Sequence, residues 1–208
     1  MKLLKIFPSI ALLASLVATA HAGAIAMSGP DSNGVVSYYG SKREGWLSKA
    51  TSGWVVGPVT GTPQAADVGA LFGGTWAKEG ELTGNGTNDL LSVALTDGAW
   101  NGNSVTGDWA IDSSFWSTYG NAVISIHVGN GAGDPDWLFW HVKAGELSGE
   151  FYYKRIAGGG GGLSNVFLWG SGDPVDITTN KVPDGGFSMI LVGLGLLTLA
   201  LFRRKLRA

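Results

Sequence analysis

The sequence contains no cysteine, and charged side chains make up only 14% of its 208 residues. Without cysteine, the chain can form neither a disulfide framework nor a thiolate-bound zinc or iron–sulfur site. The formal net charge of −2 offers no electrostatic footprint for nucleic acid. Aromatic residues and glycine are abundant, with 9 Trp and 34 Gly, and the aromatic content argues against intrinsic disorder.

Charge is distributed unevenly along the chain. The first 22 residues and the last six carry basic side chains and no acidic ones. Residues 23–182 hold eight basic and fifteen acidic side chains, a net charge of −7, together with all nine Trp. The chain therefore divides into a basic head, an acidic aromatic body of one domain's length and a basic tail.

The head, residues 1–22, has the features of a secretory signal peptide. Two lysines precede a short apolar segment, 10–17, and an A-x-A site follows it. The predicted cleavage site consists of Ala20, Ala22 and Gly23. A first transmembrane helix is the alternative, but the apolar segment is too short for one. We expect signal peptidase to release a mature chain that begins near Gly23.

The tail, residues 182–208, combines a short motif, an apolar segment and a basic cluster. The motif is Val182, Pro183, Asp184, Gly185 and Gly186. The apolar segment 187–202 would form a helix of about 24 Å, a marginal span of a hydrocarbon core of about 30 Å. The basic cluster is Arg203, Arg204, Lys205 and Arg207. By the positive-inside rule, this cluster stays in the cytoplasm and the body lies outside.

This three-part tail resembles the PEP-CTERM sorting signal, in a form similar to its VPDSG-type variant. Asp184 stands where the commonest form has glutamate, and Gly185 stands where it has a second proline. The resemblance implies recognition by exosortase, a membrane-embedded transpeptidase, cleavage near the motif, and transfer to the surface of a bacterium that makes exopolysaccharide. A plain C-terminal membrane anchor is the alternative interpretation of the same residues.

The body, residues 23–181, is predicted to be an all-β, jelly-roll-like sandwich, because short β-prone segments alternate with turn-forming residues. The expected strands are 35–39, 54–59, 74–78, 90–96, 109–111, 122–128, 137–142, 150–155 and 166–169. Alternation predicts that Trp137 and Phe139 share one sheet face and that Trp140 lies on the other. A transmembrane barrel would need longer and more regular strands. The body weakly resembles ectodomains that accompany PEP-CTERM tails, through Phe115-Trp116 and segment 162–170.

Two common catalytic sequence motifs are absent from the body, although its composition leaves a Ser–His–Asp triad open. It contains neither a G-x-S-x-G elbow nor an H-E-x-x-H zinc motif, and the strand contexts of His127 and His141 favour structural roles. The acidic residues near aromatic ones are Asp108, Asp112, Glu146 and Glu150. Glycoside hydrolysis would need two such carboxyl groups in proximity. We expect a non-enzymatic protein without a cofactor, and a glycan-active enzyme is the least favoured alternative.

Two loops are rich in oxygen donors of the kind that calcium prefers, 85–89 and 130–136. Neither has the EF-hand spacing, and Asn and Asp side chains commonly cap their own turns. We therefore predict no metal site. The glycine segment 158–162 lacks the following Lys-Ser/Thr of a phosphate-binding loop and is predicted to connect strands.

The high Trp content is the strongest indication of function in the body. Indole rings stack on the apolar faces of sugars, and the loop residues Trp100 and Trp116 are the expected exposed ones. The sequence predicts an inner-membrane-anchored precursor that reaches the cell surface or extracellular matrix of a Gram-negative-type bacterium. There the sandwich would have an adhesive or exopolysaccharide-associated role; a carbohydrate-binding module is the alternative. The expected partners are signal peptidase, an exosortase-type transpeptidase, the membrane and exopolysaccharide, but not nucleic acid.

Overall fold

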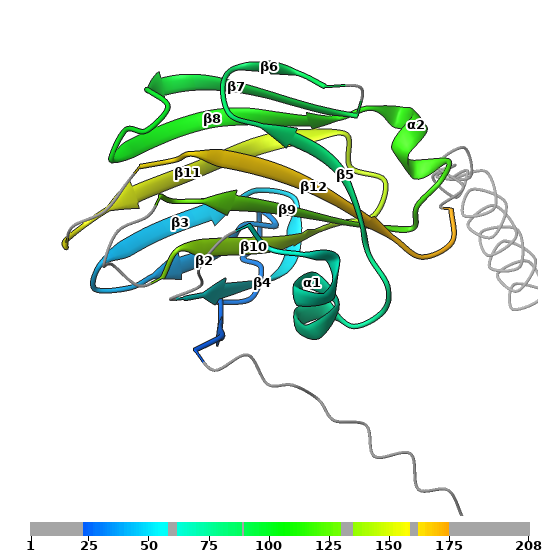
Figure 1. Cartoon of the computed structure of the whole chain (residues 1–208), viewed down its shortest axis with the longest axis horizontal. Coiled ribbons are helices and arrows are strands. Elements are labelled where there is room, and N and C mark those ends of the chain that lie inside the picture. The colour runs from blue at the N-terminus through cyan, green and yellow to red at the C-terminus, as the bar shows by residue number, and fades with distance from the viewer. Residues whose placement is uncertain (1–22, 58–61, 89, 130–134, 159–161, 175–208) are drawn as a thin grey trace, which may run out of the picture.

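A computed structural model describes residues 23–57, 62–88, 90–129, 135–158 and 162–174. The predicted signal peptide and the three-part tail lie outside these residues. Among the described residues, no helix has the length and apolar character needed to span a membrane. The described chain forms two six-stranded antiparallel sheets packed as a sandwich, which confirms the predicted all-β class (Figure 1).

Both sheets combine strands from the two halves of the chain. Sheet A has the order β1 (Ile25–Ala26), β4 (Ala50–Val56), β10 (Trp137–Val142), β9 (Asn121–His127), β12 (Asn165–Ser171), β5 (Ala77–Leu82). Sheet B has the order β2 (Val36–Tyr39), β3 (Arg43–Leu47), β11 (Ser148–Arg155), β8 (Ser104–Ile111), β7 (Leu91–Gly98), β6 (Gly86–Thr87). Two short helices, α1 (Ala65–Phe72) and α2 (Ser113–Trp116), complete the described fold.

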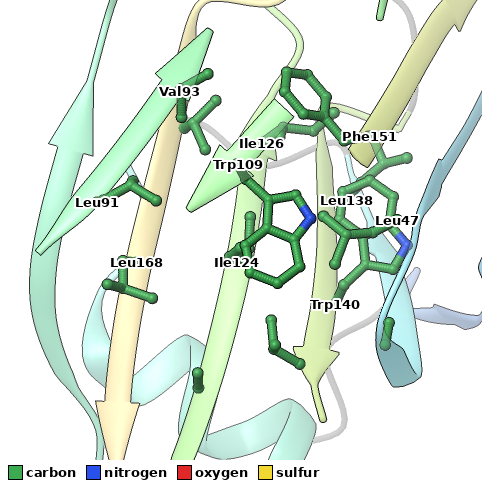
Figure 2. Packing of buried hydrophobic residues seen from close by; sticks show 14 of the residues in the cluster. Leu47, Leu91, Val93, Trp109, Ile124, Ile126, Leu138, Trp140, Phe151 and Leu168 are labelled. Atoms are coloured by element: carbon green, nitrogen blue, oxygen red, sulfur yellow. The ribbon is translucent and has the colours of Figure 1, made fainter. Parts of the chain in front are cut away.

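The main core lies between the two sheets, where inward-facing side chains from each sheet meet. Figure 2 shows Trp109 of sheet B close to Ile124 and Trp140 of sheet A in this layer. The indole nitrogen Nε1 of Trp140 donates a hydrogen bond to the carbonyl oxygen of Val36 in sheet B, over 3.1 Å. Trp140 therefore links the two sheets through packing and through a hydrogen bond.

Sheet A also carries an apolar cluster on its outer face, the face turned away from sheet B. Trp137 and Phe139 belong to this outer cluster and Trp140 to the inner core, as alternation along β10 predicts. The residues Val68, Leu71 and Phe72 of α1 pack against the outer cluster. Helix α1 lies beside β4 and β10 in Figure 1. The sandwich thus gains a partial third layer on this side.

Each predicted strand overlaps a strand of the structure and 137–142 has the expected bounds, but 74–78 overlaps β5 only at 77–78, and 109–111 is only the end of the longer β8. The prediction omitted β3, which lies between β2 and β11 in sheet B and whose Arg43 is fully buried and hydrogen-bonded. It also omitted α1, which contains Gly69. A Cβ atom at position 69 would lie 2.8 Å from the carbonyl oxygen of Gly74. The glycine that weakens the helical pattern therefore allows the chain to turn closely over the end of α1.

Candidate functional site

A pocket of about 650 Å³ opens between α1 and the outer face of sheet A. We call it the aromatic cleft. It is lined by Ser52, Trp54, Leu71, Phe72, Gly73, Gly74, Trp76, Asn121, His141, Ser171 and Gly172. Its volume falls in the range typical of small-molecule sites, and apolar rings with a few polar groups are the usual lining of such sites.

Three aromatic rings come together in the aromatic cleft from separate parts of the chain. The centroid of the His141 ring lies 5.8 Å from that of Phe72 and 6.3 Å from that of Trp76, which it meets edge-on. The indole nitrogen of Trp76 donates a hydrogen bond to the Gly73 carbonyl oxygen over 2.6 Å, which fixes the ring beside the end of α1. Trp54 on β4 is half-buried. Phe72 and His141 are also half-buried, whereas Trp76 is only 6% exposed, so the accessible ring faces of the cleft belong to Trp54, Phe72 and His141.

The polar groups of the aromatic cleft are uncharged. No Asp, Glu, Lys or Arg is among the described residues that line it. Nδ1 of His141 is hydrogen-bonded to Oγ1 of Thr51 over 2.9 Å, and Oγ of Ser171 donates to the Thr75 carbonyl over 2.6 Å. Ser52 is solvent-exposed at the cleft. Hydroxyl, amide and imidazole groups beside aromatic faces suit a neutral ligand with hydroxyl groups.

Burial lowers the pKa of His141, so the imidazole in the aromatic cleft is neutral near pH 7. Burial also lowers the pKa of His127, against the opposing effects of a hydrogen bond with Asn165 and the charge of Asp136. The unfolded chain takes up protons on histidine below about pH 6.5, whereas the folded chain takes them up only at lower pH. The contribution of the two histidines to the free energy of unfolding is therefore fully present above about pH 6.5 and is lost as the pH falls through their folded pKa values.

We accordingly expect the melting temperature to decrease as the pH is lowered from roughly 7 to 5, because the unfolded state binds more protons than the folded state in this range. The His141→Gln variant should lose part of this pH dependence, and His127→Gln another part. Scanning calorimetry at several pH values measures both effects. A wild-type slope that persists unchanged in the variant carrying both substitutions would contradict this account of the two histidines.

The acidic residues that the sequence singled out separate into two groups. Asp108 and Glu150 are cross-strand partners on β8 and β11, and both are exposed on the outer face of sheet B. Asp112 instead caps α2, where its Oδ1 accepts from the Ser114 N–H over 2.8 Å and the hydrogen bonds of Ser114 lower the Asp112 pKa. Glu146 forms ion pairs with lysines at 3.4 and 3.8 Å. Of these four residues, only Asp108 and Glu150 lie side by side on one exposed sheet face.

The prediction that Trp116 is exposed is wrong. Its side chain is fully buried, packs edge-on against Phe115 and donates a hydrogen bond to the Glu146 carbonyl oxygen over 3.1 Å. Trp100 is half-buried and donates its indole N–H to Oδ1 of Asn85 over 2.8 Å. The sequence pattern did not reveal that a one-turn helix would turn Trp116 into the core. Neither residue lines the aromatic cleft.

The described side chains Asn85 and Asn88 of the first oxygen-rich loop accept hydrogen bonds within the fold, and only Asn88 caps its own turn. Oδ1 of Asn85 also accepts from the Leu95 N–H over 3.0 Å, and Oδ1 of Asn88 accepts from the Leu91 N–H over 2.8 Å. Most of the second loop, 130–134, lies outside the described residues. Within the part of the chain that the structure describes, no group of three or more His, Cys, Asp or Glu side chains is arranged to hold a metal ion.

No known family model matches the chain, and neither a curated protein nor a solved structure shows detectable similarity to it. The functional interpretation therefore depends on the chain's own residues. Sequence reasoning missed Trp54, Phe72 and Trp76 as cleft residues because they belong to segments that meet only in three dimensions. The available signal was the alternation of β10, which places His141 on the same face as Phe139.

Proposed function

We propose that the protein is an exported, non-enzymatic component of the cell envelope or extracellular matrix, and that its β-sandwich binds a neutral glycan in the aromatic cleft. The observation that carries the binding proposal is the cleft itself, which combines Trp54, Phe72, Trp76 and His141 with uncharged hydrogen-bonding groups. Aromatic faces pack against the C–H faces of a sugar ring, and the polar groups match its hydroxyls. This refines the carbohydrate-binding interpretation of the Trp content.

The composition of the aromatic cleft favours binding over catalysis. Glycoside hydrolysis uses two carboxyl groups that flank the scissile bond, and the described lining of the cleft contains none. A neutral His141 beside Thr51 can hold a sugar hydroxyl by a hydrogen bond. We therefore propose no catalytic residue and no cofactor for this site.

The location proposed for the protein follows from the two ends of the sequence. A signal peptide and a PEP-CTERM-like tail, read by signal peptidase and by an exosortase-type transpeptidase, would deliver the body to the surface. The motif Val182–Gly186, the helix 187–202 and the basic cluster 203–208 lie outside the described residues, so their roles are proposals from sequence. We also propose a jelly-roll-like topology for the sandwich, and the strand order supports it, since each sheet takes strands from both halves of the chain.

The mass of the native protein tests the sorting proposal. Protein recovered from the cell surface or medium should begin near Gly23 and end near residues 182–186. A surface-exposed chain that retains residues 187–208 would contradict processing and would support the plain membrane anchor.

Binding is tested by titrating the surface-recovered protein with neutral oligosaccharides, including cello-, manno-, xylo- and N-acetylated chito-oligosaccharides, while Trp fluorescence is recorded. We expect saturable binding to at least one series. Trp54→Ala should weaken that binding at least tenfold, a loss of about 1.4 kcal/mol, because it removes an accessible stacking surface. Trp100→Ala, which removes a half-buried Trp outside the cleft, is the matched control and should bind like the wild type.

Two results would contradict the binding proposal. The first is the absence of binding to every neutral glycan on a broad array, with Trp fluorescence unchanged throughout. The second is equal affinity of the wild type and Trp54→Ala for the same oligosaccharide.

A further inference from the structure

The outer face of sheet B, opposite the aromatic cleft, carries a stacked aromatic pair. Trp46 on β3 and Tyr152 on β11 are cross-strand partners, and their ring centroids lie 6.1 Å apart at an interplanar angle of 25°. Both side chains are half-buried. The Tyr152 hydroxyl donates to Oε1 of Glu44 over 2.9 Å, which fixes the ring on the sheet. Tyr39, the cross-strand partner of Glu44, is 71% exposed beside them.

A hollow of about 600 Å³ lies on the same sheet, along β6, β7, β8 and β11. Small side chains form it, since Ala94 and Ala110 face outward on adjacent strands. Asp108 and Glu150 also line the hollow. Glu150 lies two residues before Tyr152 along β11, so the two side chains are on the same face of the sheet. The face thus joins an aromatic platform to an adjacent acidic hollow.

The charge of this face is unbalanced. Its acidic side chains include Glu44, Asp108 and Glu150, and the ammonium of its only described outward-facing base, Lys154, lies 3.8 Å from Glu44. Asp108 and Glu150 face each other directly across β8 and β11 and have no ion-pair partner among the described residues. Like charges in directly opposed positions destabilise a sheet, and local conflicts of this kind are expected at functional sites.

We propose that this face binds a polysaccharide segment whose sugars carry protonated amines. The rings of Trp46 and Tyr152 take the apolar faces of successive sugars, and the carboxylates of Asp108 and Glu150 hold the ammonium groups in the hollow. This proposal rests on one part of the proposed function, namely that the protein is located where polysaccharide is present. Because the two binding faces point away from each other, one molecule can hold two polysaccharide chains.

The test compares two oligosaccharides of equal length and backbone, the glucosamine hexamer and the N-acetylglucosamine hexamer, at low salt and about pH 6. We expect the wild type to bind the glucosamine hexamer at this face, and higher salt to weaken the binding by screening. Asp108→Asn combined with Glu150→Gln should lower that affinity at least tenfold. Glu79→Gln combined with Glu81→Gln, the same charge change on β5 of sheet A, should leave it unchanged.

Variants on both faces separate this proposal from the neutral-glycan site. Trp46→Ala should weaken binding of the glucosamine hexamer, whereas Trp54→Ala should not. If no neutral glycan binds but binding of the glucosamine hexamer is still weakened by Trp46→Ala, then the aromatic cleft proposal fails and this one stands. The melting temperature of the Asp108→Asn, Glu150→Gln variant should equal or exceed that of the wild type, because the substitutions remove repulsion. Trp46→Ala tests the face independently if that variant does not fold.

Three outcomes would overturn the proposal. One is equal binding of the glucosamine hexamer by the wild type and by the Asp108→Asn, Glu150→Gln variant. Another is loss of that binding in Trp54→Ala but not in Trp46→Ala. The third is calcium binding that depends on Asp108 and Glu150 in a protein that does not bind the glucosamine hexamer, which would make the carboxylate pair a cation site.

Discussion

Trp140→Ala is expected to lower the free energy of unfolding by about 3–5 kcal/mol, the usual cost of deleting a fully buried tryptophan side chain. The indole is completely buried between the sheets and donates to the carbonyl of Val36 in sheet B. Its ring also closely approaches Gly45, where a Cβ atom would lie 3.7 Å from the indole Cη2. Alanine would leave a cavity in the layer that joins the sheets and would remove this hydrogen bond between them.

Urea unfolding monitored by circular dichroism measures this loss. Trp46→Ala is the matched control, because Trp46 lies half-buried on the outer face of sheet B, and it should cost much less. A loss below about 1 kcal/mol for Trp140→Ala would show that the two sheets do not depend on this contact.

Arg43→Met is expected to destabilise the protein by about 3 kcal/mol, because it removes the charged donor from a buried network of hydrogen-bonded residues. Arg43 is fully buried; its Nε donates to the Pro135 carbonyl oxygen over 2.8 Å, and a terminal guanidinium nitrogen donates to the Tyr153 hydroxyl over 3.0 Å. The pKa of Tyr153 is raised by burial and lowered by Arg43, which indicates a shared environment. Asp136, only 7% exposed, also acts on the Tyr153 pKa.

Tyr153→Phe provides the comparison for Arg43→Met. It keeps the aromatic ring and the charge of Arg43 and removes only one acceptor, so it should cost about 1 kcal/mol. Thermal and urea unfolding of both variants give the two losses. If Arg43→Met proved as stable as the wild type, the guanidinium would contribute no net stability and β3 would owe its central position to packing alone.

Much of the sandwich could be predicted from local sequence. Alternation in 122–128 and 137–142 gave both the strands and the face of Trp140, because a side-chain period of two follows from strand geometry alone. The strand β3 could not be predicted in this way, since its Arg43 and Glu44 read as surface residues. The buried side chain of Arg43 is hydrogen-bonded to acceptors from Pro135 and Tyr153, which lie far away in sequence.

The residues that line the aromatic cleft could not be predicted from the sequence. From the number of Trp residues we predicted a sugar-binding surface, and from their loop positions we chose Trp100 and Trp116, neither of which lines the cleft. Trp54, Trp76 and His141 converge because α1 packs on sheet A, and this short, glycine-containing helix has little sequence signal. Asp108 and Glu150 were already candidates, and only the register of β8 with β11 pairs them.

The measurement that tests the central claim most directly is a titration of the Trp indole N–H signals by NMR, using the surface-recovered protein and the neutral oligosaccharide that it binds. The account predicts that the signals of Trp54 and Trp76 shift on binding, while those of the interior Trp109, Trp116 and Trp140 remain in place. Saturable binding that leaves Trp54 and Trp76 unmoved and shifts only the signals of other Trp residues would contradict the account.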